Sequence, residues 1–502
     1  MMFALDMRPG LGCGEQKSVA NQTDVSIIIA LCNLDEEAGM ISETVVELSR
    51  WQFAITAMLH FLFIPMTLGL ALLLALMESA YVWSRRAIYK AMAQFWGRLF
   101  AINFVLAVAT RLLVVFQFGM DGSYFSHYAG DVFALPLAIE ALTGFFVAAT
   151  LFGPYWFGWE TFGRKQHLLL TWLIAIAAHV SAYWILTANG WLQNPIGAAF
   201  NYRSYRMELN DFDLLLANPV AVAKYLHTVA ASYAVAGATL VAICAYWLKR
   251  NPGDQMARRS YKLAAGMGLL ALVITAALSD STPDSDNLTQ RAKRVAISGE
   301  ADKQLLPDIE ARIRNGVAAY DLLQQLRDEN KDPKLLAEFE RLRADLGYAW
   351  LLTPIHKKIV GASDKQINMA AQSALPAFPG LIFWAHRLMI IAGMVGLLGF
   401  VLAAWGGWGD KPVPLWLLGL GIYMAPLPWL ASVLGWFVAE AGKQPWAIAG
   451  VLPTYLGVSS LSAMQLVVSA IAYALAYALL LGVGLYLMRR AVLDRRAIPE
   501  GA

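Results

Sequence analysis

Five side chains that could bind a metal or move a proton lie inside long apolar stretches of this sequence: His60, Glu140, His227, Met389 and Glu440. Imidazole nitrogens, thioether sulfur and carboxylate oxygens are donor atoms that hold transition metals and haem iron. Ionisable groups are costly to place in an apolar, membrane-like setting, so each one suggests a function. The remaining ionisable side chains singled out in such stretches are Arg111, His179, His386 and Arg387.

Each of these residues also has a simpler interpretation. A single histidine in a helical bundle is as often a hydrogen bonder between helices as a ligand, and one methionine among 18 more often packs than binds iron. Glu440 could be an interfacial carboxylate that extends outward, and Arg387 could pair with a neighbouring acid. We interpret His179 and His386 as packing or hydrogen-bonding residues.

The composition is that of a membrane protein. Of 502 residues, 58% are hydrophobic and 15% are charged, whereas soluble domains carry about 25% charged residues. The net charge of +3 does not suggest a nucleic-acid partner. Cys13, Cys32 and Cys244 show neither metal-ligand spacing nor a CxxCH motif, which argues against a disulfide framework and a covalently attached haem.

The apolar stretches are long enough to cross a bilayer, which takes about 20 residues. Six precede a polar insert of the chain and three follow it. The nine runs cover residues 53–82, 95–118, 131–158, 167–190, 219–248, 260–278, 380–405, 414–438 and 462–488. We therefore predict an all-α polytopic membrane protein with nine transmembrane helices and a helical extracytoplasmic loop between helices six and seven.

Lysine and arginine concentrate in alternate loops, which places the N-terminus outside, the C-terminus in the cytoplasm and the insert outside. Within the insert, Asp308–Arg327 and Lys334–Leu352 have apolar residues at helical spacing, which predicts an ordered cap. The expected division is an N-terminal extension or disordered segment (1–41, with Met40 as the expected true start), helices one to six (42–278), the extracytoplasmic loop (279–379), helices seven to nine (380–490) and a cytoplasmic tail (491–502).

The direction of each span gives the depth of its functional side chain. At 1.5 Å per residue, His60 lies about 10 Å into an inward-running helix that starts at residue 53. His227, Glu140 and Met389 lie eight or nine residues into inward-running spans, and Glu440 lies at the outer end of the eighth span. All five therefore fall in the outer half of the membrane, which a layer of buried cofactors would require.

From about residue 42 to the last span, the sequence resembles subunit I of cytochrome bd-type quinol oxidases. The GKQPW motif after a glutamate-bearing helix is a specific signature, in which Lys443 stands where the family has arginine. The matching strings are ELSRWQFAITAMLHFLFIPMTLG, NFVLAVAT, FQFG, SYFSHYAGDVFALPLAIE, NGWLQNPIGAAFN, NPVAVAKYLHTVAASY, RIRNGVAAYDLLQQLR and GWFVAEAGKQPWAIAGVLPT.

This resemblance implies a terminal oxidase with three haems, namely two haems b and a haem d or a third b-type haem. His227 and Met389 would hold the low-spin haem b, and Arg387 would pair with a haem propionate. His60 and Glu440 would be the axial ligands of the two high-spin haems, without an assignment of either haem type to either residue.

The resemblance also implies catalytic roles for Glu140, expected close to the high-spin pair, and for Trp436, expected among the haems. Lys293 and Gln290 would bind quinol in the outer loop. The expected reaction is quinol oxidation at the outer face and dioxygen reduction to water, electrogenic but without proton pumping. Expected partners are subunit II, a small single-span subunit, quinol, dioxygen and lipid of the bacterial cytoplasmic (inner) membrane.

Several positions depart from the family pattern. Val115 and Ala148 stand where family members carry acids, and Arg111 replaces a small residue one turn before Val115. Ser298 stands where a quinol-site glutamate is expected, and Glu300 is the nearby acid that could replace it. These changes leave a second interpretation open, in which the protein is a divergent haem-binding paralogue with weak or altered oxidase activity and a role in redox or gas sensing. A transporter or channel that relays protons is the alternative from another class.

Overall fold

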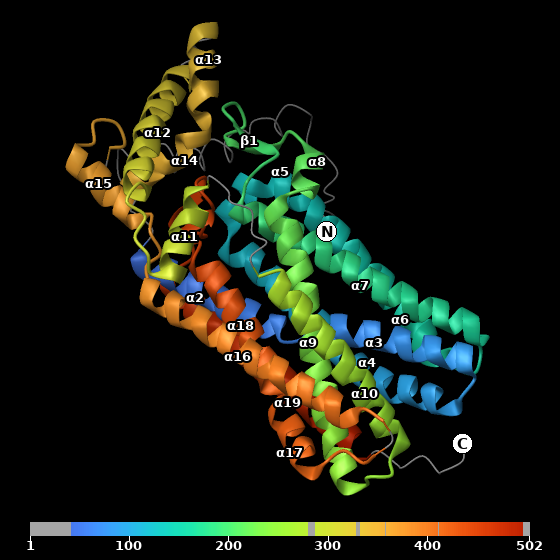
Figure 1. Cartoon of the computed structure of the whole chain (residues 1–502). Helices are drawn as coiled ribbons and strands as arrows, with labels where there is room; N and C mark the ends of the chain where they lie inside the picture. The colour runs from blue at the N-terminus through green and yellow to red at the C-terminus, as the bar shows by residue number, and fades with distance from the viewer. Residues whose placement is uncertain (1–41, 280–286, 328–331, 357, 410, 495–502) are drawn as a thin grey trace, which may run out of the picture.

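The computed structural model describes residues 42–279, 287–327, 332–356, 358–409 and 411–494 (Figure 1). The expected N-terminal extension over 1–41 and the end of the expected tail, from residue 495, lie outside these described residues.

Nine helical segments of the described chain are long and apolar enough to span a membrane, which confirms the predicted count and the all-α class. Six spans are uninterrupted helices. These are α4 (Ala87–Asp121), α7 (Arg164–Gln193), α9 (Pro219–Arg250), α10 (Gln255–Ala277), α16 (Pro379–Gly407) and α19 (Ala463–Leu493).

The other three spans are interrupted. The first consists of α2 (Glu43–Phe61) and α3 (Ile64–Ser84), the third of α5 (Ser123–Glu140), the π-helical segment Ala141–Val147 and α6 (Ala148–Phe157), and the eighth of α17 (Leu415–Tyr423) and α18 (Pro426–Ala441). Proline stands at the start of both α3 and α18, where it fits a helix start but not a helix interior. Interrupted backbone inside a membrane is tolerated where protein surrounds it.

The start of the first span corrects the depth predicted for His60. That prediction counted from residue 53, but α2 already begins at Glu43, because its polar first turns continue the helix beyond the apolar run. His60 is the penultimate residue of α2, directly before the interruption at Leu62 and Phe63. Its level in the molecule therefore has to be judged from its neighbours rather than from a residue count.

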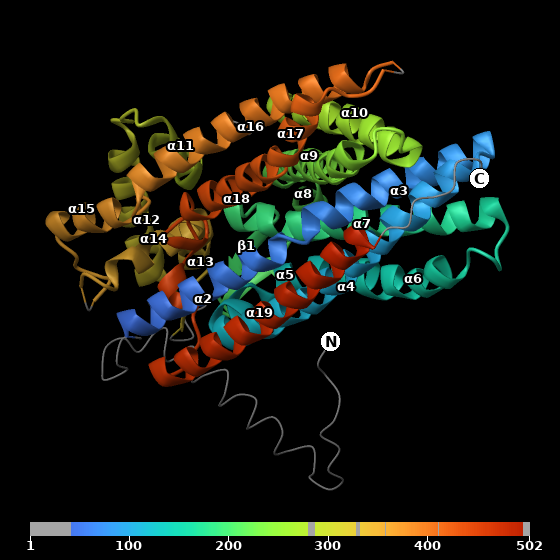
Figure 2. The same ribbon diagram turned by 90° about the horizontal axis from the view of Figure 1, so that it is seen from below.

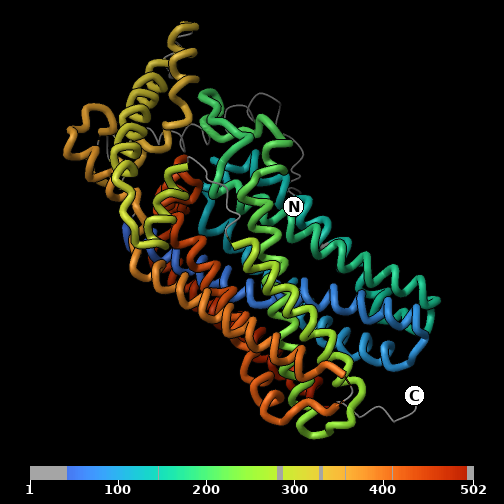
Figure 3. The backbone as a smooth tube through the Cα atoms, in the orientation of Figure 1, coloured from blue at the N-terminus to red at the C-terminus, as the bar shows by residue number. Residues whose placement is uncertain are grey.

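The central helices share one apolar core. Helix α9 packs against α3, α7, α10 and α17, and α16 packs against α10 and α18 (Figures 1 and 3). The core includes the fully buried side chains of Leu70, Trp96, Ala236 and Phe400. Seen from below in Figure 2, α19 runs beside α2 and α4, which it contacts.

The polar insert forms an ordered helical cap beyond one end of the bundle (Figure 1). It contains α11 (Leu288–Ser298), α12 (Leu305–Arg327), α13 (Pro333–Leu342), α14 (Leu346–Ala349) and α15 (Asp364–Ser373). The first predicted loop helix is confirmed as α12. The second predicted stretch is not one helix, because 3-10 turns at Arg343–Asp345 and Trp350–Leu352 divide it.

Two small antiparallel hairpins, which the sequence did not lead us to expect, complete the cap end. They pair β1 (Ala198–Asn201) with β2 (Arg206–Leu209), and β3 (Trp446–Ile448) with β4 (Leu452–Pro453). Phe200, Phe339 and Ile448 are buried together in one apolar cluster. The hairpins thereby join loops of the spanning region to the cap.

The contact between α3 and α9 gives a testable expectation for stability. A Cβ at Gly69 would clash with the Cβ of Ala236 and would lie 2.9 Å from the Ser232 carbonyl oxygen. We expect Gly69→Ala to lower the free energy of unfolding by about 1–3 kcal/mol, measured by thermal unfolding in detergent. The matched control is Gly266→Ala, where nothing lies within 4 Å of the added atom. Equal midpoints for the two variants would contradict this close approach.

Candidate functional site

Glu440, on the last turn of α18, is surrounded by donors from two other helices and from the loop that follows α18. Its Oε2 lies 2.9 Å from Lys443 Nζ, and its Oε1 lies 3.6 Å from Lys224 Nζ on α9. From α7, Asn189 Nδ2 and Gln193 Nε2 donate to Oε1 at 3.1 and 3.3 Å. The protein itself therefore compensates the negative charge of this carboxylate, which explains how it is tolerated at the end of an apolar helix.

The cap reaches this cluster through α11. Lys293 Nζ donates to Gln193 Oε1 at 3.3 Å, and Gln290 Nε2 donates to the Gln193 carbonyl oxygen at 3.2 Å. Burial first, and the positive charge of Lys224 second, lower the pKa of Lys293 to about 7. The two residues predicted for quinol are thus one hydrogen-bonded residue away from Glu440.

Trp436 connects three of the spans. It lies one turn before Glu440 on α18, and its ring centroid is 5.1 Å from that of Phe61 on α2. Lys224 Nζ lies 5.1 Å from the Trp436 ring. Because Phe61 follows His60 directly, His60, Trp436 and Lys224 lie at one level of the bundle.

His60 makes a hydrogen bond that leaves one ring nitrogen available. Its Nδ1 lies 2.9 Å from Thr110 Oγ1 on α4, while the Thr110 hydroxyl donates to the Leu106 carbonyl oxygen at 2.8 Å. Thr110 Oγ1 therefore accepts from Nδ1–H, so the lone pair is on Nε2. A hydrogen bond of this kind is what orients a histidine ligand toward a metal.

Glu140 is the last residue of α5 and forms an ion pair with Arg111 of α4. Its side chain is 3% exposed and that of Arg111 20%. Ser181 Oγ of α7 donates to Glu140 Oε1 at 2.8 Å. Because Arg111 follows Thr110, the hydrogen-bonding partner of His60, Glu140 lies on the His60 side of the site.

His227 lies three residues after Lys224 on α9, close to one helical turn away. Within the described part of the chain, neither nitrogen of its half-buried ring has a hydrogen-bonding partner. Met389 Sδ lies 3.1 Å from the point that a Cβ on Gly435 would occupy, so glycine provides the room for the thioether against α18. Both side chains therefore offer a free donor atom, as a haem b with histidine and methionine ligands requires.

Two other polar residues of the spans, Arg387 and His179, have protein partners. Arg387 Nη1 donates to the carbonyl oxygens of Ile297 and Phe383 at 3.0 and 3.1 Å, which ties α16 to α11. His179 bonds the Ala175 carbonyl oxygen and the Tyr233 hydroxyl, both at 2.7 Å. The interpretation of His179 as a hydrogen-bonding residue is therefore confirmed.

The donor set suits haem rather than a bare metal ion. Among the described residues, no three His, Cys, Asp or Glu side chains gather as a bare ion would require. Haem needs only one or two axial ligands from the protein. The free His60 Nε2, the unbonded His227 ring, the Met389 sulfur and the carboxylate of Glu440 meet that need.

The positions that depart from the family pattern lie in different surroundings. Val115 is 51% exposed and Ala148 is 1% exposed. Ser298 ends α11, and both it and Glu300 are exposed, with the Glu300 backbone N–H donating to Ser298 Oγ at 3.0 Å. Glu300 is therefore a surface residue, whereas Lys293 points into the cluster.

Sequence reasoning missed the residues that connect the site, namely Lys224, Asn189, Gln193, Thr110 and Ser181. Lys224 carried a detectable signal, because it is a lysine three residues before His227 in an apolar helix. The four neutral residues carried none, since serine, threonine, asparagine and glutamine are ordinary in such helices.

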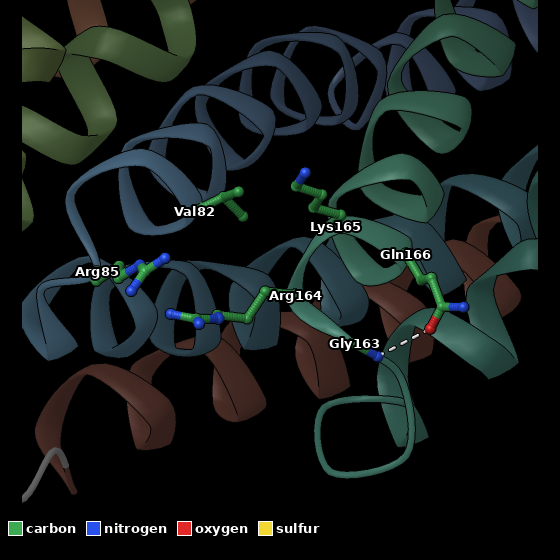
Figure 4. Close-up of a pocket in the computed structure, with 6 residues that line it drawn as sticks. All are labelled: Val82, Arg85, Gly163, Arg164, Lys165 and Gln166. Carbon is green, nitrogen blue, oxygen red and sulfur yellow. Dashed lines mark hydrogen bonds between the residues drawn. The ribbon is translucent and has the colours of Figure 1, made fainter.

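A basic pocket lies far from this site. It is about 380 Å³ in volume and is lined by Val82, Arg85, Gly163, Arg164, Lys165 and Gln166 (Figure 4). The pocket is at the beginning of α7, whereas Asn189 and Gln193 are at its end, about 40 Å away at 1.5 Å per residue. It therefore takes no part in the cluster around Glu440.

The fold and the donor set define a polytopic membrane protein with buried sites suited to haem. The family model for cytochrome bd terminal oxidase subunit I matches residues 48–495. The chain therefore belongs to this family, as the sequence resemblance predicted, and it is the membrane-integral subunit of an oxidoreductase.

Relatives support this membership. Cytochrome bd-II ubiquinol oxidase subunit 1 of Escherichia coli (strain K12) is 38% identical over 493 residues, covering 89% of this chain and 96% of the relative. Cytochrome bd ubiquinol oxidase subunit 1 of Bacillus subtilis (strain 168) is 33% identical over 442 residues, covering 86% and 90%. The solved structure of bd oxidase from Geobacillus thermodenitrificans shares the fold, with a TM-score of 0.65 at 21% identity, covering 90% of this chain and 100% of the other.

The charge balance around Glu440 gives a second testable expectation. Glu440→Ala leaves Lys224 and Lys443 without their carboxylate, so we expect a loss of about 1–3 kcal/mol in unfolding free energy. The control is Glu47→Ala, which removes a half-exposed carboxylate paired with Arg50 at 2.5 Å on α2. That change should cost less than about 0.5 kcal/mol. Thermal unfolding of both variants measures the difference, and a similar small loss in both would show that the lysines do not depend on Glu440.

Proposed function

We propose that this protein is the haem-bearing subunit of a quinol:dioxygen oxidoreductase, which oxidises quinol at the outer face of the membrane and reduces dioxygen to water. The observation that carries the proposal is the link through Gln193, which hydrogen-bonds Lys293 and Gln290 of the cap and also Glu440 of the membrane cluster. The residues proposed to bind quinol would then lie next to a residue proposed to bind haem. Two similar relatives bear the name ubiquinol oxidase subunit 1.

The proposed haem ligands follow from the available donor atoms. His227 and Met389 would hold the low-spin haem b, with Arg387 beside it at the junction of α16 and α11. His60, through Nε2, and Glu440 would hold the two high-spin haems, a haem b and a haem d or a third b-type haem. When bound, these haems supply the electron path and the place of dioxygen reduction.

Trp436 and Glu140 are the two further side chains of the proposed site. Trp436 contacts Phe61, which follows His60, and Lys224, which pairs with Glu440. Its ring would therefore lie between the haem sites proposed at His60 and at Glu440. Glu140 lies on the His60 side, where its charge would act on the oxygen site.

Lys293 would take over the role of the missing quinol-site acid. Oxidation of two quinols releases four protons and provides the four electrons that reduce one dioxygen to two waters. A proton acceptor must therefore face the quinol hydroxyl, and acid–base groups work best when their pKa lies near the operating pH. The buried amine of Lys293 has a pKa of about 7, whereas Glu300 is exposed. Gln290, one turn earlier on α11, would orient the quinol.

We further propose the placement of the enzyme. It would lie in the bacterial inner membrane with the cap (279–379) outside, helices one to six (42–278) and seven to nine (380–490) in the bilayer and the C-terminus in the cytoplasm, in line with the loop charges. Protons for water would come from the cytoplasm, so turnover would be electrogenic without pumping. Subunit II would complete the enzyme, with a small single-span subunit as a further partner.

The direct test is to express the chain with subunit II and purify the assembly. We expect a reduced-minus-oxidised spectrum with b-type bands and quinol-driven oxygen uptake. Haem bands without oxygen uptake would instead indicate a sensor or an inactive paralogue. A colourless assembly would show that the protein does not bind haem.

The low-spin ligand pair can be tested through one thioether. Met389→Leu keeps the volume but removes the sulfur donor, so we expect loss of the low-spin haem b signal with the high-spin signals retained. The matched control is Met394→Leu on the same helix, a side chain that is 59% exposed. An unchanged low-spin spectrum in Met389→Leu would refute the ligand assignment.

The pH dependence of turnover tests Lys293. Below about pH 7 the amine carries its proton and cannot accept another, so kcat/KM for quinol should rise with pH through about 7 and then level off. Lys293→Met should remove this rise and lower kcat/KM by about 10²-fold or more. Lys303→Met, which changes an exposed lysine beyond the end of α11, should keep the wild-type profile. A Lys293→Met enzyme with the wild-type pH profile would exclude this base.

A further inference from the structure

The ion pair between Arg111 and Glu140 is a charged feature that the proposed reaction does not explain. The Glu140 side chain is nearly inaccessible, and both of its neighbouring polar groups are donors: the Arg111 guanidinium and the Ser181 hydroxyl. A guanidinium has no acceptor atom and does not lose its proton in proteins. A carboxylate accepts from both groups, whereas a protonated carboxyl group would lose its charge attraction to the guanidinium and leave that cation unpaired among apolar helices.

The backbone around Glu140 is shaped for the same arrangement. The π-helical segment Ala141–Val147 follows Glu140 directly, and such segments are frequent at functional sites. Within it, a Cβ at Gly144 would clash with Ser181 Oγ and would lie 3.2 Å from Glu140 Oε1. Glycine at this position therefore permits Ser181 to reach the carboxylate.

The ion pair and His60 are held by the same turn of α4. Thr110 bonds His60 Nδ1, and the next residue, Arg111, bonds Glu140. The buried Tyr477 of α19 donates to the carbonyl oxygens of Thr110 and Thr56 at 3.3 and 3.2 Å, which fixes this turn against α2. The position of the charge pair relative to His60 is therefore set by the fold.

Among the residues that the structure describes around the pair, none is an acid with which Glu140 could exchange a proton. Val115, one turn after Arg111 on the same face of α4, and Ala148, at the start of α6, stand at the two positions where acids were expected. The described polar groups that face Glu140 are thus Arg111 from α4 and Ser181 from α7, with His60 of α2 bonded to Thr110, the residue before Arg111.

We propose that Arg111 is a positioning residue that holds Glu140 as a permanent carboxylate, so that the pair is a fixed dipole beside His60 and Glu140 is not a proton carrier. The proposal rests on the proposed function only for the role of His60 as a haem ligand. Its test does not depend on turnover of quinol or dioxygen.

The test is infrared difference spectroscopy of the assembled oxidase between about pH 5 and pH 8, a range in which a free glutamic acid finishes its titration. Wild type and Glu140→Gln should give the same signal in the carboxylic-acid C=O region, because Glu140 is ionised throughout. Arg111→Gln should add a C=O band, which the double variant Arg111→Gln/Glu140→Gln lacks. Arg111→Lys keeps the charge and should resemble wild type.

The controls separate this role from a purely structural one. Arg98→Gln changes an exposed arginine on the same helix and should leave the spectrum unchanged. If Arg111→Gln fails to assemble, the double variant should assemble better, because removing both partners leaves no unpaired charge in the membrane. Equal failure of both, a Glu140 band in wild type, or no new band in an assembled Arg111→Gln would each overturn the proposal.

Discussion

The compensation of charge within the apolar bundle, largely by residues from neighbouring helices, is the constraint on which the site depends. An isolated carboxylate in an apolar bundle has an unfavourable solvation energy, so it must be paired or protonated. Glu440 is paired with Lys443 and Lys224, and Glu140 with Arg111. The Lys224–Glu440 pair joins α9 to α18, which are distant in sequence, and the Arg111–Glu140 pair joins the consecutive helices α4 and α5. The positions of these four helices are thereby coupled to the chemistry of the site.

Neutral side chains extend these pairs into a connected network. Gln193 hydrogen-bonds Glu440 in the membrane and Lys293 in the cap, and Asn189 lies between Glu440 and Lys224. Networks of this kind fix the positions of their members more strongly than single hydrogen bonds do. The cap is thus connected to the membrane site through α7, which provides a physical path from the proposed quinol residues to the proposed haem ligands.

The two halves of the site differ in their electrostatics. Around Glu440, two lysines face one carboxylate and a third, Lys293, lies close by, so this half is rich in positive charge. Around His60, Arg111 and Glu140 balance one another. An excess of cations suits a ligand with acidic groups, and haem carries two propionates, whereas a balanced pair beside a histidine changes the local field without adding net charge.

By itself, the sequence determined the class, the nine spans and the family, because length and hydrophobicity of a spanning helix are local properties. It also identified His60, His227, Met389 and Glu440 as unusual, because a polar donor in an apolar run is visible without a structure. Tertiary structure decided the partners. Nothing along the chain shows that Thr110 orients His60, that Arg111 pairs with Glu140 or that Gln193 joins cap and membrane. These contacts exist only because helices far apart in sequence pack side by side, and hydrogen bonds and ion pairs act over a few ångströms of space rather than along the chain.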